Sequence, residues 1–271
     1  MQNKLHHKTI VLSDLHLGSK WSKAAEVLDF LRKNSCDTLI LCGDIIDGWS
    51  ILRGNNIKWR RIHTNVMKYI LFMSETTKIV YIRGNHDDFL DRIQPLSFAN
   101  ISIVKDYVYE SFGKRYLVTH GDEFDDITTN WRWLSKLGDI GYTLLLNLNS
   151  FYNKRRSERN LTYRSISSIV KRKIKSSISY IGDYENHLAE VAGKRNCAGV
   201  ICGHIHHPEN KLIGDLLYIN SGDWVESLSA ATEEYDGTWK IIYYYSDETI
   251  QDNSVRTSLQ GTLGIRVPAT I

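Results

Sequence analysis

The chain has 271 residues, of which 42% are hydrophobic and 24% are charged, and its net charge is +3. These proportions are typical of a globular domain and exclude a disordered or collagen-like chain. No stretch approaches the roughly 18 uninterrupted apolar residues of a membrane-spanning helix, and the four cysteines show no CxxC spacing. Because the first residues, MQNKLHHKTIVLSD, lack the apolar stretch of a signal peptide, we expect a cytoplasmic protein.

The first half of the chain alternates between predicted strands and helices. Three apolar runs predict buried strands at residues 9–12, 38–41 and 78–82. Between them, two segments place apolar side chains at helical spacing, at residues 22–34 and 58–74, and Ser22 is the expected cap of the first helix. This alternation of strand and helix is typical of a sheet covered by helices.

Shorter strands follow after residue 98. Segments around residues 102–104, 108–111 and 115–119 predict a second sheet with a turn at Gly113-Lys114. Towards the end, LLYINSGDW and ATEEYDGTWKIIYYY predict further strands, with a hairpin at Asp236-Gly237. The predicted class is α/β (α+β), built from two mixed sheets that pack face to face and are flanked by helices.

A long interval of 84 residues separates His120 from His204, and it has helical spacing at residues 134–151 and 163–192. We interpret this interval as a helical cap insertion at residues 126–195. The main domain is then predicted at residues 1–125 and 196–271. We expect partial order in the C-terminal stretch after Tyr245, because Leu259, Leu263, Ile265 and Val267 offer some apolar surface.

Five short polar segments each follow an apolar run: SDLH (13–16), GDIID (43–47), GNHDD (84–88), THGDE (119–123) and CGHIHH (202–207). Because strand ends present ligands at the edge of a sheet, we expect these segments to converge. They supply the oxygen and imidazole ligands Asp14, His16, Asp44, Asn85, His120, His204 and His206.

Such ligands suit Mn²⁺, Fe²⁺ or Zn²⁺, and a pair of ions about 3.5–4 Å apart can clamp both oxygens of a displacement at phosphorus. A carboxylate must bridge the two ions, and Asp44 is the candidate. One DxH or GxH alone would be weak, because a histidine at a strand end is more often a hydrogen-bonded polar residue than a ligand. Five matches in a fixed order favour a two-metal hydrolase.

The ordered set DxH, GDxxD, GNHD, HGD and GHxH resembles the calcineurin-like metallophosphoesterases, whose fold is a four-layer α/β/β/α sandwich. The resemblance places Asp14, His16, Asp44 and His206 on one ion and Asp44, Asn85, His120 and His204 on the other. Mn²⁺ is the expected ion, with Fe²⁺ and Zn²⁺ as alternatives. The resemblance also implies that His86 faces the phosphate and assists the leaving oxygen.

A histidine beside two cations needs a carboxylate to hold its tautomer, and we expect Asp87 to orient His86. The alternative is that His86 lies near the metals with no role in proton transfer.

The predicted cap is strongly basic. Residues 153–175 contain nine Lys or Arg and one acid, a net charge of +8, and Arg155, Arg156 and Arg159 are the candidate substrate-binding residues. Such a patch can bind substrate phosphate or an anionic membrane surface. Nucleic acid is a less favoured target, and a solvated helix face is the alternative without function.

Within the family, residues 8–245 are most similar to the UDP-2,3-diacylglucosamine pyrophosphatase group. The similarity implies a nucleotide-linked lipid substrate, cleaved to UMP and an acylated sugar 1-phosphate in lipid A biosynthesis, and peripheral contact with the inner membrane. The chain departs from that group at His86, where its well-known members carry arginine. The alternatives are a phosphoesterase for another phosphodiester or nucleotide, and a non-catalytic scaffold that binds membranes or partners.

Overall fold

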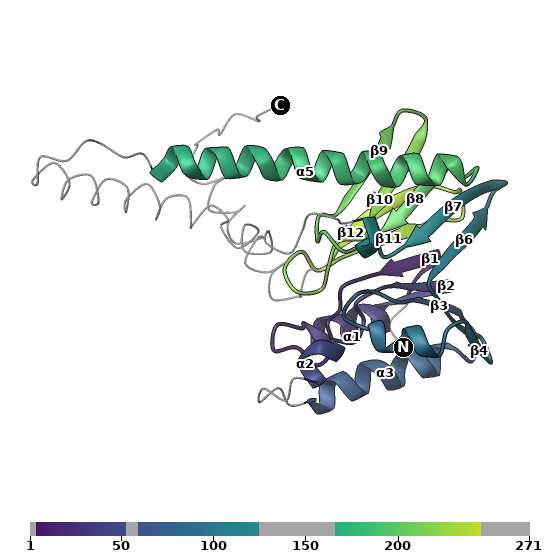
Figure 1. Cartoon of the computed structure of the whole chain (residues 1–271). Coiled ribbons are helices and arrows are strands. Elements are labelled where there is room, and N and C mark those ends of the chain that lie inside the picture. The colour runs from purple at the N-terminus through teal and green to yellow at the C-terminus, as the bar shows by residue number, and fades with distance from the viewer. Residues whose placement is uncertain (1–3, 53–58, 125–165, 245–271) are drawn as a thin grey trace, which may run out of the picture.

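A computed structural model of the chain describes residues 4–52, 59–124 and 166–244, and for residues 166–179 it describes the backbone only (Figure 1). In this part of the chain two sheets of seven and five strands lie face to face. Helices cover the outer face of each sheet, which gives the layers α/β/β/α (Figure 1). The prediction of two mixed sheets flanked by helices is therefore confirmed.

The first sheet has the strand order β12-β11-β1-β2-β3-β5-β4. Its central strands β1, β2, β3 and β5 are parallel to one another, whereas β11, β12 and β4 pair antiparallel at the two sides. The strands are β1 (Leu5–Leu12), β2 (Asn34–Cys42), β3 (Lys78–Ile82), β4 (Leu96–Phe98), β5 (Ile101–Val104), β11 (Ser229–Glu233) and β12 (Trp239–Tyr243).

The second sheet has the order β6-β7-β8-β10-β9, in which β7, β8 and β10 are parallel. Its outer strands pair antiparallel, and the turn between β6 and β7 has positive φ at Phe112 and Gly113, as a tight hairpin requires. The strands are β6 (Asp106–Ser111), β7 (Lys114–Thr119), β8 (Gly199–Cys202), β9 (Glu209–Ile213) and β10 (Leu216–Asn220).

Among the helices, α1 and α3 cover the first sheet, while α5 lies along the second (Figure 1). The structure has Lys23 rather than Ser22 at the N-cap of α1, because the Ser22 hydroxyl donates to the Leu15 carbonyl, 2.7 Å away. The helices are α1 (Ala24–Lys33), α2 (Gly48–Leu52), α3 (Arg61–Met73) and α5 (Ile166–Lys194), with 3-10 turns η1 (Asp88–Arg92) and η2 (Asp122–Phe124).

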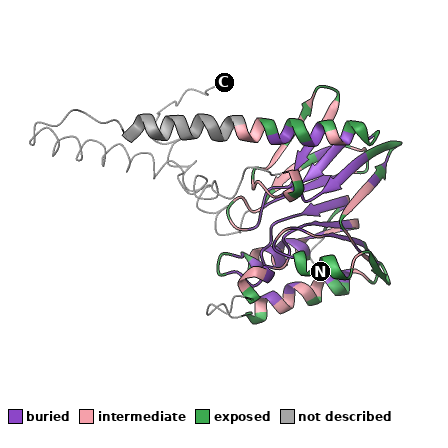
Figure 2. Ribbon diagram, in the orientation of Figure 1, coloured by how far each residue is buried: buried purple, intermediate pink, exposed green. Residues whose placement is uncertain are grey.

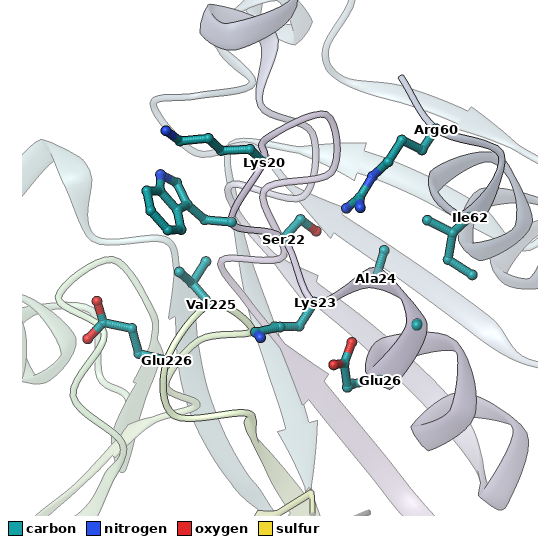
Figure 3. A pocket seen from close by; sticks show the side chains of 11 residues that line it. Lys20, Ser22, Lys23, Ala24, Glu26, Arg60, Ile62, Val225 and Glu226 are labelled. Atoms are coloured by element: carbon teal, nitrogen blue, oxygen red, sulfur yellow. The ribbon is translucent and has the colours of Figure 1, made fainter. Parts of the chain in front are cut away.

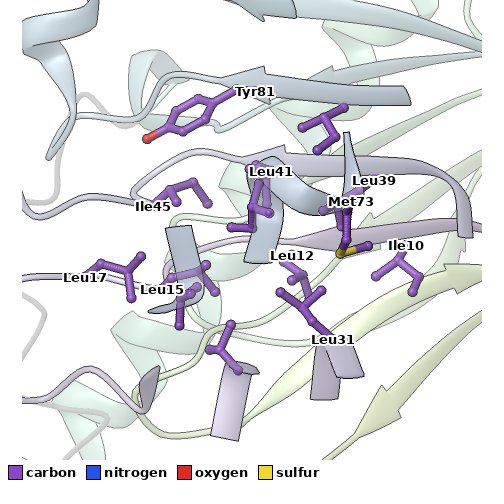
Figure 4. Packing of buried hydrophobic residues seen from close by; sticks show 14 of the residues in the cluster. Ile10, Leu12, Leu15, Leu17, Leu31, Leu39, Leu41, Ile45, Met73 and Tyr81 are labelled. Atoms are coloured by element: carbon purple, nitrogen blue, oxygen red, sulfur yellow. The ribbon is translucent and has the colours of Figure 1, made fainter. Parts of the chain in front are cut away.

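Three apolar layers hold the sandwich together, and strand alternation supplies them. In β1, Ile10 and Leu12 pack under α1 and α3 in the outer layer, whereas Val11 faces the other sheet (Figure 4). Between the second sheet and α5 lies a third layer that includes Leu188 and Val200. The inner strands are accordingly the most buried part of the molecule (Figure 2).

One predicted strand lies in a different sheet from the one expected, and most of the predicted cap is not described. The strand near residues 102–104 was assigned to the second sheet, but β5 lies in the first sheet, parallel to β3, because Ile101 and Ile103 pack in the outer apolar layer. Most of the predicted cap, residues 126–165, lies outside the described residues, as does the stretch after Tyr245. The last turns of α5 pack on the second sheet, and the cap boundaries stay a prediction.

Candidate metal centre

The five polar segments all follow strands whose carboxyl ends meet at one edge of the sandwich. Asp14, Asp44 and Asn85 follow the parallel strands β1, β2 and β3, while His120 and His204 follow the parallel strands β7 and β8. Backbone hydrogen bonds join two of the loops, from the Asp14 N–H to the Gly43 carbonyl (3.0 Å) and from the His16 N–H to the Asp44 carbonyl (2.9 Å). The parallel order of the strands therefore brings the five polar segments together, as the sequence predicts.

The loops at this edge carry unusual backbone strain. Left-handed φ angles are rare for residues other than glycine and cost about 1–3 kcal/mol each. Five predicted ligands have such angles, between 45° and 67°, namely Asp14, His16, Asp44, His204 and His206. Backbone strain that is concentrated at candidate metal ligands is typical of a functional site.

Asp44 lies at the centre of the cluster. Its carboxylate is 3.7 Å from Nε2 of His16, 3.5 Å from Nε2 of His120 and 3.9 Å from Nε2 of His86. The Asp14 carboxylate lies 3.0 Å from Nε2 of His206 and 3.8 Å from Nε2 of His16. In the described part of the chain, three sets of side chains are close enough to hold an ion: Asp14–His16–His206, His16–Asp44–His86 and Asp14–Asp44–His120.

Several buried ligand atoms make no hydrogen bond, although buried polar atoms nearly always make one. Among the described residues these include Nε2 of His16, Nε2 of His120 and Oδ1 of Asn85. The His120 ring donates from Nδ1 to the Cys42 carbonyl, 3.0 Å away, which fixes Nε2 towards the cluster. Buried nitrogen and oxygen atoms without hydrogen bonds, in loops that also carry carboxylates, fit divalent cations.

The electrostatics of the cluster agree with this fit. Burial lowers the pKa of His16 to about 4, so its ring is neutral at pH 7 and can offer a lone pair. Burial alone would raise the pKa of Asp44, but the nearby charge of His120 holds that pKa well below its usual range. Burial likewise opposes a charged His120, yet Asp44 and Asp14 raise its pKa to about 10. A proton on His120 thus balances the negative charge of Asp44 and Asp14, which a bound metal cation would also neutralise.

The partner of His86 differs from the prediction. Its Nδ1 lies 3.0 Å from the carboxylate of Asp47, and its ring lies against Trp49, with centroids 4.3 Å apart. Asp47 also accepts hydrogen bonds from the backbone N–H and the hydroxyl of Ser50. Although burial works in the other direction, the bonds from His86 and Ser50 lower the pKa of Asp47 to about 2. Asp47 is therefore ionised beside His86.

Asp87, the expected partner, points elsewhere. Its fully buried carboxyl accepts hydrogen bonds from the Tyr81 hydroxyl (2.7 Å) and from the backbone N–H groups of Ile45 (3.0 Å) and Gly84 (2.5 Å). The prediction that Asp87 orients His86 was wrong, because Asp87 satisfies the backbone of two ligand loops instead. The second aspartate of GDIID, three residues after Asp44, was the sequence signal for Asp47.

Sequence reasoning also missed Arg83. Its guanidinium forms ion pairs with Asp122 (2.5 Å), Glu123 (2.9 Å) and Asp91 (3.0 Å). Burial opposes its charge, but these carboxylates raise the pKa of Arg83. Since Arg83 comes two residues before Asn85 and Asp122 two residues after His120, this cluster joins ligand loops of both sheets.

Asp223 was missed as well. Its carboxylate is fully buried and accepts hydrogen bonds from the backbone N–H groups of Val225 (2.8 Å), Glu226 (2.6 Å) and Ser227 (3.2 Å). It also lies 3.9 Å from Nδ1 of His206. Asp223 therefore shapes the loop after β10 beside a predicted ligand.

The predicted substrate-binding residues Arg155, Arg156 and Arg159 lie outside the described residues. Among the residues described, no helix combines the length and the apolar character needed to cross a membrane.

The chain is similar to several known proteins. A UDP-2,3-diacylglucosamine hydrolase of Shewanella loihica is 23% identical over 232 residues, which cover 80% of this chain and 89% of that protein. One of Photorhabdus laumondii subsp. laumondii is 31% identical over 117 residues, 42% of this chain and 48% of that protein. A predicted phosphoesterase structure from Streptococcus pneumoniae TIGR4 has a TM-score of 0.36 and 17% identity, covering 87% of this chain and 97% of its own.

The sequence model of one family matches most of the chain. It is described as calcineurin-like phosphoesterase, and it spans residues 7–208, which include all five polar segments. The chain therefore belongs to the calcineurin-like phosphoesterase family and is a metal-dependent hydrolase.

Proposed function

We propose that the chain hydrolyses the diphosphate bridge of UDP-2,3-diacylglucosamine and releases UMP and 2,3-diacylglucosamine 1-phosphate, a step of lipid A biosynthesis. The names of the relatives from Shewanella and Photorhabdus support this substrate. The single observation that carries the chemistry is Asp44, which is buried between histidines of both sheets and belongs to two of the three candidate ion-binding sets.

We assign Asp14, His16, Asp44 and His206 to one divalent ion, and Asp44, Asn85, His120 and His204 to the other, with Mn²⁺ as the ion. The unsatisfied atoms of His16, His120 and Asn85 support this assignment. When bound, two such ions polarise the phosphoryl group and lower the pKa of water.

The surrounding residues bind, orient and move a proton. Water adds across the bridge, one P–O bond breaks, and the bridging oxygen leaves with one of the two phosphates. His86, held by Asp47 at Nδ1, donates a proton from Nε2 to that leaving oxygen. Asp47 is ionised at neutral pH and keeps the ring in one orientation.

A second candidate function is hydrolysis of another phosphodiester or nucleotide. His86 favours it, because the well-known pyrophosphatases that this chain resembles carry arginine after the asparagine. The basic segment at residues 153–175 would serve either substrate, since attraction of phosphate is not specific.

Arg155, Arg156 and Arg159 are proposed to bind the substrate phosphates or an anionic membrane, on the strength of the net charge of +8 around them. Replacing all three with glutamine should weaken sedimentation with vesicles of anionic phospholipid and raise KM for the lipid substrate. If neither quantity changes, these side chains are a solvated face.

The assignment is tested by Mn²⁺-dependent hydrolysis of UDP-2,3-diacylglucosamine beside a bis-aryl phosphodiester, with products resolved by mass. We expect efficient release of UMP from the lipid and little turnover of the aryl diester. Turnover of the aryl diester without cleavage of the lipid would keep the phosphoesterase and overturn the lipid substrate.

A further inference from the structure

A cavity of about 720 Å³ opens at the N-terminal ends of α1 and α3 (Figure 3). The loop before α1 forms one wall, with Lys20, Trp21 and Lys23, and Arg60 at the start of α3 forms another. Val225 and Glu226 close the third side. This volume is typical of small-molecule sites, for which the range is about 300–1,000 Å³.

Two loops connect the cavity to the metal centre. One runs from His16 through Leu17 to Lys20. The other passes between the two regions, because the Trp224 N–H donates to the Asp14 carbonyl and the Trp224 carbonyl accepts from the Lys23 N–H, both at 3.1 Å. The loop that carries Asp14 and His16 therefore continues into the wall of the cavity, and the Trp224 backbone joins that wall to the Asp14 loop.

The cavity walls carry more positive than negative charge. Lys20, Lys23 and Arg60 are exposed, and in the described part of the chain none of them forms an ion pair with a carboxylate (Figure 3). Glu26 and Glu226 are the acids of the lining, which leaves an excess of one positive charge. Cations without counter-ions around a cavity fit an anionic ligand.

An aromatic side chain adds a second recognition feature. Trp21 is 56% exposed, and Nζ of Lys20 lies 4.6 Å from the centroid of its ring. Aromatic faces next to basic groups bind nucleotides, because the ring stacks on the base while the cations neutralise phosphate.

We propose that this cavity binds the nucleotide half of the substrate. Trp21 stacks on the base, and Lys20, Lys23 and Arg60 neutralise the phosphate that is not attacked. The inference rests on the proposed function in one respect, namely that the substrate is nucleotide-linked. It adds a specificity site on the wall formed by the loop before α1, distinct from the basic segment at residues 153–175.

The test is calorimetric titration of the metal-loaded full-length protein with UMP, with uridine and inorganic phosphate in parallel. Trp21→Ala should weaken UMP and uridine binding about tenfold, the loss expected for one base stack. Lys23→Ala should weaken UMP binding several-fold and leave uridine binding within twofold. Thermal unfolding of each variant checks that the fold is intact.

Matched controls lie on the β11–β12 hairpin and on β12. Tyr235 is 53% exposed, close to the value for Trp21, and Lys240 is exposed, so Tyr235→Ala and Lys240→Ala should leave UMP binding unchanged. UMP affinity that stays within twofold in Trp21→Ala, or that falls equally in Tyr235→Ala, would overturn the inference.

The same variants separate this inference from the proposed function. UMP binding that depends on Trp21 and Lys23, in a protein that fails to cleave UDP-2,3-diacylglucosamine, would overturn the lipid substrate and support the nucleotide site. Cleavage of that lipid with unchanged kcat/KM in both variants would support the function and overturn the site. Binding of inorganic phosphate as tightly as UMP, insensitive to Trp21→Ala, would reduce the cavity to a plain anion site and also overturn the inference.

Discussion

The contact between His86 and Asp47 gives the sharpest prediction about the chemistry. Asp47→Asn removes the charge from a side chain that is nearly buried and lies 3.0 Å from Nδ1 of His86. A hydrogen bond to a charged group contributes about 1.5–3 kcal/mol. Since about 1.36 kcal/mol corresponds to a tenfold change in rate, we expect kcat to fall by about 12-fold to 150-fold.

The assay is steady-state hydrolysis of UDP-2,3-diacylglucosamine at saturating Mn²⁺, with metal content measured on the same samples. The side-chain hydrogen bonds of Asp47 within the described part of the chain go to His86 and Ser50, so metal content and KM should change little. Ser50→Ala is the matched control, because it removes a hydroxyl that also binds Asp47 but leaves the bond to His86. Equal losses of kcat in the two variants would refute a positioning role for Asp47 and indicate that it only caps α2.

Three further predictions concern the metals, the ion pairs and acid stability. Asp44→Ala should abolish Mn²⁺-dependent hydrolysis and reduce the metal content, measured by mass spectrometry, below two ions per chain. Two retained ions with normal turnover would contradict the bridging role of Asp44. Arg83→Met should leave Asp122 without its partner and cost about 2 kcal/mol, or roughly 4–8 °C in Tm, whereas Arg195→Met, at an exposed pair, should cost less than about 1 kcal/mol. The depressed pKa of Asp47 stabilises the fold above pH 4, and this contribution is lost as the pH falls towards 2. In urea titrations between pH 4 and pH 2, the free energy of unfolding of Asp47→Asn should therefore fall less than that of the parent protein.

The strands and the ligand edge were predictable from the sequence, because each depends on local chemistry. The run Leu39-Ile40-Leu41 contains only apolar residues, which predicts a buried strand, and β2 buries all three side chains. Asp44 comes three residues after Leu41, just beyond the end of β2, so the end of the strand determines its position. Parallel neighbours then brought the other polar segments to the same edge.

The predictions that were wrong or missing concern contacts between segments that lie far apart in the sequence. Asp47 and Asp87 are the same type of residue in neighbouring motifs, and only the fold reveals that Asp87 satisfies backbone N–H groups while Asp47 reaches His86. Ser22 has the composition of a cap, yet its hydroxyl binds Leu15 in the preceding loop. Arg83 has no motif of its own, since its partners come from segments that only the fold brings to it.

We propose that Asp44 bridges two divalent ions. The most direct test is electron paramagnetic resonance of the protein loaded with Mn²⁺, with the bound metal counted by mass spectrometry. We predict two Mn²⁺ ions per chain and the spectrum of an exchange-coupled pair, which Asp44→Ala removes. A single bound ion, or two ions with uncoupled spectra in the parent protein, would contradict the account.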